Sequence, residues 1–222
     1  MEITWLGQAG IMLRDFDITI IIDPYLSDSC GKMNPKLKRR VSVDAKFLEI
    51  NPDVIICTHS HRDHTDPETL KHYLAGDKSM TVLAPQGAWE IVREFGGNHN
   101  YIRFNRHTEI TINNCRFTAV LAEHEDVHPI GVIIEKGSKK YYITGDTLYN
   151  RDIFADIPDD IYMMFVPVNG RVNNLIMTDA QRFCEMIKPQ IAVPLHCGLF
   201  DDIDMNDFEY KNKIVPQFYK KI

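Results

Sequence analysis

The sequence lacks the features that mark membrane, secreted and nucleic-acid-binding proteins. None of its apolar runs approaches the length of a membrane-spanning helix, and its first residues, MEITWLGQAG, have neither the basic start nor the apolar core of a signal peptide. Basic residues are not in excess, because the net charge at pH 7 is −6, whereas a broad nucleic-acid-binding face is usually basic. We therefore expect a cytoplasmic protein that binds neither membranes nor nucleic acid.

Cysteine is scarce and scattered. The chain has five cysteines, an odd number, and no two of them form a Cys-x-x-Cys pair. This pattern argues against a disulfide framework and against a thiolate zinc site, so a reducing compartment is the natural inference. Cys197 lies next to His196, but free cysteines are usually buried, and we expect it to line a pocket as a small apolar residue.

Low-complexity segments, internal repeats and linker-like breaks are also absent, which favours one domain over residues 1–222. Short strands are predicted at 3–6, 11–14, 18–23, 54–58, 81–84, 109–112, 116–121, 131–135, 140–144, 162–166 and 191–195. Helices are predicted at 44–49, 67–75, 86–95, 179–187 and 206–213, with Thr178 or Asp179 capping the fourth and Pro189 beyond its end. Strands interleaved with helices indicate an α+β domain of mixed α/β character with at least two sheets.

What the chain does contain is a dense group of metal-ligand side chains. Residues 59–64 read His-Ser-His-Arg-Asp-His, and these imidazole and carboxylate groups suit Zn²⁺, Mn²⁺ or Fe²⁺. The apolar run 53–57 predicts a buried strand before the cluster, and Asp66, Pro67 and Glu68 predict a helix start after it. The ligands therefore lie on a loop between a strand and a helix, where functional groups commonly project.

A single ion does not account for this cluster. Asp63 and His64 are adjacent, so they cannot easily turn toward the same ion as both His59 and His61, and a two-metal site fits better if further ligands arrive from elsewhere. Three distant positions qualify because each lies just past a predicted strand, namely His124, Asp146 and His196. Each has a plain alternative, a structural histidine or a turn aspartate. Their shared placement predicts that they converge on one edge of a sandwich.

Taken together, these residues resemble the metallo-β-lactamase superfamily. The His-x-His-x-Asp-His cluster, a following histidine, a Gly-Asp-Thr aspartate and a last strand-end histidine come in the same order. The segments at 5–11 (WLGQAGI), 22–25 (IDPY), 145–147 (GDT) and 194–196 (PLH) are similar to the branch that contains L-ascorbate-6-phosphate lactonase. The pieces Gly31-Lys32, Asn34-Pro35 and 177–180 also look like that lactonase, although this chain is shorter at both ends.

The resemblance implies a four-layer αββα sandwich and two divalent metal ions, Zn²⁺ or Mn²⁺, with Fe²⁺ also accepted by such ligands. One ion would be bound by His59, His61 and His124, and the other by Asp63, His64 and His196, with Asp146 bridging. His128 is an alternative to His124, which we prefer because the segment 129–131 then falls at the family's spacing. Flavo-iron relatives carry glutamate where this chain has His61, which points to hydrolysis rather than oxygen chemistry.

Two neighbouring cations lower the pKa of a shared water toward about 7. We therefore expect a metal-bound hydroxide that attacks an electrophilic carbonyl or phosphorus. Asp63 is the expected catalytic residue, which holds a metal and either orients the hydroxide or accepts a proton. Asp23 is a candidate for fixing an imidazole tautomer, with a turn aspartate as the alternative. No general acid is visible, which favours a reaction such as lactone opening.

The expected substrate is a small anionic molecule, with a sugar-acid phosphate lactone first. Asn169, Arg171 and Tyr149 are predicted substrate contacts, and His128 is placed at the mouth of the site. The basic residues 32–40 form either a solvated loop or an anion-attracting rim. One alternative function is a phosphodiesterase or RNA-processing nuclease of the same superfamily, which the net charge disfavours. Another is a non-catalytic metal-binding protein. Homo-oligomerisation remains open.

Overall fold

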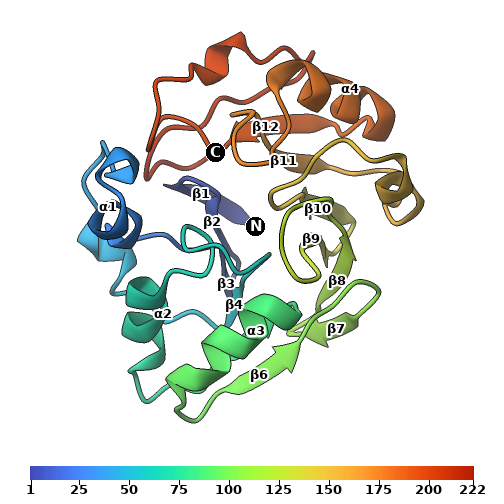
Figure 1. Ribbon diagram of the computed structural model, residues 1–222. Coiled ribbons are helices and arrows are strands. Elements are labelled where there is room, and N and C mark those ends of the chain that lie inside the picture. The colour runs from blue at the N-terminus through green and yellow to red at the C-terminus, as the bar shows by residue number, and fades with distance from the viewer.

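Two six-stranded sheets form the centre of the molecule (Figure 1). The structure, a computed structural model, describes residues 1–222. The first sheet contains, in spatial order, β1 (Glu2–Gly7), β2 (Gly10–Arg14), β3 (Thr19–Ile22), β4 (Val54–Ile56), β5 (Thr81–Ala84) and β6 (Asn100–Arg103). The second contains β12 (Ile191–Leu195), β11 (Met163–Pro167), β10 (Lys139–Ile143), β9 (Ile130–Lys136), β8 (Cys115–Leu121) and β7 (Glu109–Ile112).

The central strands β3 and β4 of the first sheet bury both of their faces, and the alternation of side chains explains how. Ile20, Ile22 and Ile56 belong to the large core that also contains residues of the second sheet. Their neighbours Ile21 and Ile55 point the other way, into a smaller core shared with helices. Because successive strand residues face opposite sides, a continuous β-branched run is the sequence of a strand covered on both faces.

Helices complete the outer layers. Leu70 and Leu74 of α2 (Pro67–Leu74) and Ala88 of α3 (Gln86–Val92) pack in the smaller core against the first sheet. Phe183 of α4 (Met177–Ile187) packs in the large core. Figure 1 shows α4 beside β11 and β12 of the second sheet. The resulting αββα sandwich of α+β class is the fold predicted from the sequence. None of these helices is both long and apolar enough to cross a membrane.

The predicted N-cap of α2 was confirmed, whereas the helix predicted at 179–187 is present as α4 but its predicted cap was wrong. The Asp66 side chain caps α2 by accepting hydrogen bonds from the backbone N–H groups of Glu68 and Thr69. In contrast, α4 begins at Met177, and its N-cap residue Ile176 offers no side-chain hydrogen bond, so neither Thr178 nor Asp179 caps it. The short helix α1 (Ser29–Met33) was not among the helices predicted from the sequence.

Other predicted helices are shorter than expected. Residues 44–49 contain only the 3₁₀ turn Ala45–Phe47, and residues 206–213 only the end of the 3₁₀ turn Met205–Asp207. The helix predicted at 86–95 divides into α3 and a 3₁₀ turn at Arg93–Phe95. Strand β6 was missed by the sequence prediction.

The end of the chain protects the edge of the first sheet. Residues 219–222 run beside β1, where Tyr219 N–H donates to the Trp5 carbonyl at 2.8 Å and Ile222 N–H donates to the Ile3 carbonyl at 3.0 Å. The Phe218 ring stacks on the buried Trp5 ring at 4.3 Å between centroids. An exposed edge strand is prone to pairing with other chains, so this tail closes a vulnerable edge.

Replacing Phe218 with alanine is expected to lower the free energy of unfolding by about 2–3 kcal/mol, because it removes a half-buried aromatic contact. Urea denaturation followed by tryptophan fluorescence measures this change. Phe16→Ala is the matched control, since Phe16 is fully exposed and its loss should cost less than about 0.5 kcal/mol. Equal effects of the two substitutions would show that the tail contributes nothing to stability.

Candidate metal centre

The predicted metal ligands meet at the carboxyl ends of strands. His59, His61, Asp63 and His64 occupy the loop between β4 and α2. The other ligands follow strands of the second sheet, His124 after β8, Asp146 after β10 and His196 after β12. Strand β9 is antiparallel to both β8 and β10, and β11 and β12 continue parallel to β10, so β8, β10, β11 and β12 all point the same way. The topology therefore delivers distant side chains to one edge of the sandwich, as the sequence predicted.

Two of the ligand-bearing strands, β10 and β12, are followed by a tight backbone turn. Gly145 immediately before Asp146 has φ +62°, and a Cβ there would lie 2.7 Å from the Ile130 carbonyl oxygen. This position requires glycine, because a side chain would collide with the neighbouring backbone. His196 also adopts a left-handed conformation, with φ 70°. The backbone turns sharply at both positions, which directs the two side chains across the sheet edge.

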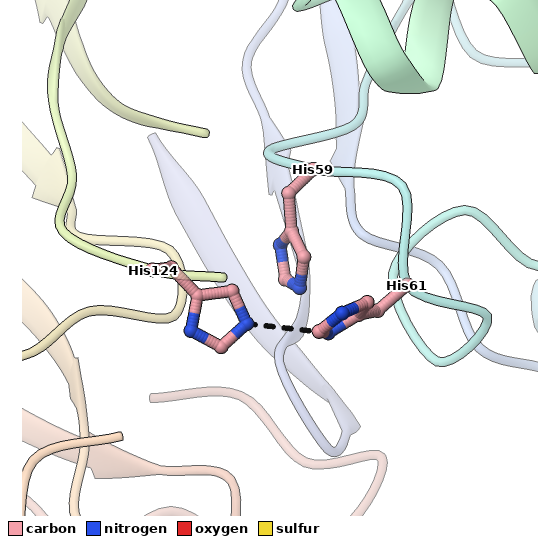
Figure 2. Close-up of side chains that lie close together, drawn as sticks. All are labelled: His59, His61 and His124. Atoms are coloured by element: carbon pink, nitrogen blue, oxygen red, sulfur yellow. Dashed lines mark hydrogen bonds between the residues drawn. The ribbon is translucent and has the colours of Figure 1, made fainter. Parts of the chain in front are cut away.

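The ligand atoms form three overlapping groups of three, of which two correspond to the predicted division and the third joins His59, His64 and Asp146. His59, His61 and His124 offer ring nitrogens within 4.8 Å of one another, and their imidazoles point toward a common centre (Figure 2). The second group has donor atoms equally close together and comprises Asp63, His64 and His196.

Asp146 lies between these two groups. Its Oδ1 is 3.3 Å from His64 Nε2 and 3.2 Å from His196 Nε2, whereas its Oδ2 is 3.9 Å from His124 Nε2. One carboxylate oxygen thus approaches each set, which is the placement that a bridging ligand requires.

Charge in this cluster favours bound cations. Burial opposes ionisation of Asp146, but His196 and His64 outweigh it and hold the pKa of that carboxyl well below its ordinary value. Burial also opposes a charge on His64, yet the Asp146 and Asp23 carboxylates raise the pKa of this histidine well above its usual range. His59 differs, because burial lowers its pKa well below the ordinary value and leaves a neutral ring with a free lone pair.

These residues fit a pair of divalent metal ions. His59 Nε2 is buried without a hydrogen-bond partner, although an isolated buried polar atom is costly. His64 Nε2 and His196 Nε2 lie only 3.1 Å apart and both face Asp146 Oδ1, so the three atoms are close enough to share one cation. Imidazole and carboxylate donors are the ligands that Zn²⁺, Mn²⁺ and Fe²⁺ accept.

A surrounding set of hydrogen bonds orients the imidazoles. His64 Nδ1 lies 2.8 Å from Asp23 Oδ2, and the same carboxylate accepts hydrogen bonds from the Thr58 N–H at 2.7 Å and the Thr58 hydroxyl at 2.6 Å. His124 Nδ1 lies 3.1 Å from the Asn173 carbonyl oxygen, an acceptor that selects the Nδ1–H tautomer. Both contacts leave Nε2 free to bind a metal. Asp23 therefore occupies the supporting position predicted for it.

Sequence reasoning missed two of these supporting side chains. Gln8, in the β1–β2 turn with φ 51°, donates from Nε2 to Asp63 Oδ2 at 2.8 Å. Asp126 accepts hydrogen bonds from the Ser60 N–H and, at 2.8 Å, from the Ser60 hydroxyl, and so supports the ligand loop. Gln8 falls within the WLGQAGI segment, but its single amide carries no local signature of a role at a metal centre.

A pocket of about 300 Å³ opens beside the ligands. His61, Asp63, Asp146 and His196 form part of its wall, and Cys30, Leu37, Val172 and Phe200 contribute apolar surface. Arg62 and Arg171 also line it, and neither guanidinium makes an ion pair or a hydrogen bond elsewhere in the protein. The pocket thus combines metal ligands with two cations that lack a protein partner.

Two of the four predicted substrate contacts line this pocket, and the other two lie elsewhere. Asn169 lines it with Arg171, and Asn169 Nδ2 lies 3.0 Å from His196 Nδ1. Tyr149 does not reach it, because its ring packs against Phe154 and Phe183. His128 is exposed and lines a separate open pocket together with His124, and its role at the site stays a prediction.

Most charges of the basic loop have structural partners. Lys32 pairs with Glu68 at 2.6 Å, Arg40 pairs with Asp202, and Arg39 donates to the Tyr25 and Ser27 carbonyl oxygens. Leu37 of this loop and Cys30 just before it line the pocket, whereas none of the loop's lysines does. All five cysteines are free and buried, as expected, and burial raises the pKa of Cys197 to about 12.

Known proteins are similar to this chain in sequence and in architecture. The sequence profile of the β-lactamase superfamily domain matches residues 2–196. A UPF0173 protein of Pyrococcus furiosus is 29% identical over 218 residues, which cover 94% of this chain and 89% of that protein. A UPF0173 metal-dependent hydrolase of Carboxydothermus hydrogenoformans is 26% identical over 223 residues, with 96% and 92% covered.

A solved structure shares the fold over the whole chain. It is a metallo hydrolase of the archaeon Ignicoccus hospitalis, which superposes with a TM-score of 0.77 at 18% identity and covers 100% of this chain and 97% of that one. The fold is therefore that of the metallo-β-lactamases. On the profile match, the chain belongs to the metallo-β-lactamase superfamily, and its relatives include the UPF0173 metal-dependent hydrolases.

Proposed function

We propose that the protein is a binuclear metal-dependent hydrolase of a small anionic substrate, with a sugar-acid phosphate lactone as the first candidate. The observation that carries the proposal is the pair of three-ligand groups with Asp146 between them, on the wall of a pocket that also holds two unpaired arginines. The names of the relatives, metal-dependent hydrolases, support the class of reaction. The similarity to the lactonase branch noted in the sequence supports the choice of substrate.

The geometry supports the proposed metal set. His59, His61 and His124 would hold one ion and Asp63, His64 and His196 the other, with Asp146 between them. When bound, two such cations lower the pKa of a water molecule toward about 7 and polarise the oxygen of the group under attack. Zn²⁺ and Mn²⁺ are the proposed ions, and Fe²⁺ also suits these donors.

Asp63 is the proposed catalytic carboxylate. The Gln8 amide donates to its Oδ2 at 2.8 Å, and the same oxygen lies 3.5 Å from His196 Nε2, so this hydrogen bond fixes the carboxylate beside the ligand cluster. In lactone opening, water adds across the acyl C–O bond and gives an alcohol and a carboxylic acid, which releases its proton to solvent at neutral pH. Asp63 accepts the proton that the water loses and returns a proton to the alkoxide as the C–O bond breaks. The departing oxygen stays attached to the product, so the reaction needs no separate leaving-group site.

The remaining pocket residues would bind and orient the substrate. Arg62 and Arg171 can donate charge-assisted hydrogen bonds to a phosphate or carboxylate group, and a planar guanidinium suits either anion. The apolar side chains of Leu37, Val172 and Phe200 restrict access of water to the bound molecule. A pocket of about 300 Å³ suits a small molecule rather than a polymer.

The test combines metal analysis with a substrate panel. Protein purified without added metal should contain about two divalent ions per chain. It should open a phosphorylated sugar lactone faster than the unphosphorylated lactone or a phosphodiester. Arg171→Gln should raise KM for the phosphorylated lactone by about 10-fold or more, with little change for the neutral one.

Arg182→Gln is the matched control, because Arg182 lies on α4 outside the pocket and should leave both KM values unchanged. A preference for phosphodiesters would instead support the phosphodiesterase alternative. Two bound ions without turnover of any panel member would support the non-catalytic alternative.

A further inference from the structure

A second feature of the pocket is a buried carboxylate that has no positive partner. Asp201 follows the last ligand strand, lines the pocket and is only 6% exposed. Its Oδ1 accepts hydrogen bonds from the backbone N–H groups of Gly198 at 2.9 Å and Ile203 at 3.1 Å. Its Oδ2 has no hydrogen-bond partner in the protein, and no arginine or lysine forms an ion pair with it.

The two backbone hydrogen bonds determine how this carboxylate can act. They fix one oxygen and with it the plane of the group, so Oδ2 is the atom available to a molecule in the pocket. The adjacent Asp202, in contrast, pairs with Arg40 and its side chain is 83% exposed. Because the protein provides no donor to Oδ2, this oxygen is free to accept a hydrogen bond from a molecule in the pocket.

The charges around the pocket limit what that donor can be. Arg62 and Arg171 line the same pocket as Asp201 and disfavour a cationic ligand group. A carboxylate at neutral pH accepts hydrogen bonds and donates none, so a neutral donor such as a hydroxyl group is the complementary partner. A molecule with both an anionic group and a hydroxyl group would satisfy the arginines and Asp201 together.

We propose that Asp201 binds a hydroxyl group of the substrate, which makes the substrate a polyhydroxylated acid or its lactone rather than an unsubstituted one. This inference rests on the proposed function for the location of the reacting group, but binding alone can test it. Asp201 is a substrate-binding residue in this arrangement and takes no part in proton transfer.

Asp201→Asn is the informative substitution because an asparagine side chain has the same shape as an aspartate side chain. The backbone N–H groups of Gly198 and Ile203 would select the amide oxygen, so Nδ2 would replace Oδ2 in the pocket. A hydrogen-bond acceptor thereby becomes a donor, and a hydroxyl oriented to donate loses its partner. Asp201→Ala removes the contact without reversing it and serves as the second variant.

The experiment measures binding of two probes to the metal-loaded protein by calorimetry. The probes are 6-phosphogluconate and 6-phosphohexanoate, which share both anionic ends and differ in their hydroxyl groups. The wild type should bind 6-phosphogluconate at least about 10-fold more tightly, and both Asp201 variants should weaken that binding about 10- to 100-fold. Binding of 6-phosphohexanoate should change by less than about 2-fold.

Asp202→Asn is the matched control and should alter neither affinity. Hydroxyl groups can also bind the metals directly, but that contribution is common to the wild type and the variants, so the comparison isolates Asp201. Equal weakening of both probes in both variants would show a structural role and overturn the proposal. The proposal would also be overturned if the wild type bound both probes equally well, or if an Asp201 variant lost kcat while its binding of 6-phosphogluconate was unchanged.

The outcomes also separate this inference from the proposed function. Asp201-dependent selectivity for 6-phosphogluconate without hydrolysis of any lactone would support the inference and contradict the lactonase activity. Lactone hydrolysis that does not depend on Asp201 would support the lactonase activity and contradict the inference about Asp201.

Discussion

Asp146→Asn is expected to reduce hydrolysis by about 10³-fold or more and to lower the metal content from two ions per chain to one or none. Asp146 is the one carboxylate that lies near both ligand groups, with Oδ1 3.2 Å from His196 Nε2 and Oδ2 3.9 Å from His124 Nε2. Asparagine keeps the shape but removes the negative charge that balances two adjacent cations. Repulsion between the cations then weakens binding of both.

Elemental analysis after dialysis and steady-state kinetics measure these two effects. Asp156→Asn is the matched control, since Asp156 is also a hydrogen-bonded aspartate but lies away from the ligands. Burial opposes its ionisation, yet hydrogen bonds from Arg106 and the Leu121 N–H hold its pKa at about 2. Its loss should cost stability above about pH 4, where the carboxylate is ionised in both states, and leave the metal content unchanged. A fully active Asp146→Asn enzyme with two ions would contradict the bridging role.

The parts of the site that could be predicted are those encoded locally or by strand order. His59, His61 and His64 are recognisable because their spacing on one loop is itself informative. His124, Asp146 and His196 depend on topology, and they were found because each follows a strand and parallel strands end at one edge of a sheet. Arranging them around a centre required the three-dimensional structure.

The residues that were missed act through contacts between distant segments. Gln8 reaches Asp63 across 55 positions of the sequence, and Asp126 reaches Ser60 across 66. Neither contact has a sequence period, a motif or a composition that signals it. Tyr149 shows the converse error, because its place after Asp146 suggested the pocket while its aromatic ring is satisfied by Phe154 and Phe183.

The fold shows the same division between local and distant causes. Strands with continuous β-branched runs, such as β3 and β4, were predicted, whereas β6 has no fully buried residue and depends on pairing with β5. The helix predicted over 206–213 fails because its apolar residues do not form one buried face. Only Met205 and Phe208 are buried in that region, and the chain there follows tertiary contacts.

Asp23→Asn is expected to weaken metal binding about 10- to 100-fold while leaving every metal ligand in place. The Asp23 carboxylate accepts hydrogen bonds from the Thr58 N–H and hydroxyl and lies 2.8 Å from His64 Nδ1. An asparagine amide cannot replace it, because either orientation points its NH₂ group at one of these donors. Facing His64, the NH₂ group favours the tautomer with the proton on Nε2, which blocks the nitrogen that faces the metal site.

The substitution should also lower the free energy of unfolding of the metal-free protein by about 3–5 kcal/mol, since His64 and Asp23 are completely buried partners. Competition with a chelator measures metal affinity, and denaturant titration measures stability.

Asp53→Asn is the matched control, because Asp53 accepts a hydrogen bond from the Thr19 N–H beside β3 but lies at the opposite end of that strand. It should lower stability without changing metal affinity. Equal losses of affinity in the two variants would mean that Asp23 acts by stabilising the sheet, whereas a loss confined to Asp23→Asn would establish that the orientation of His64 controls metal binding.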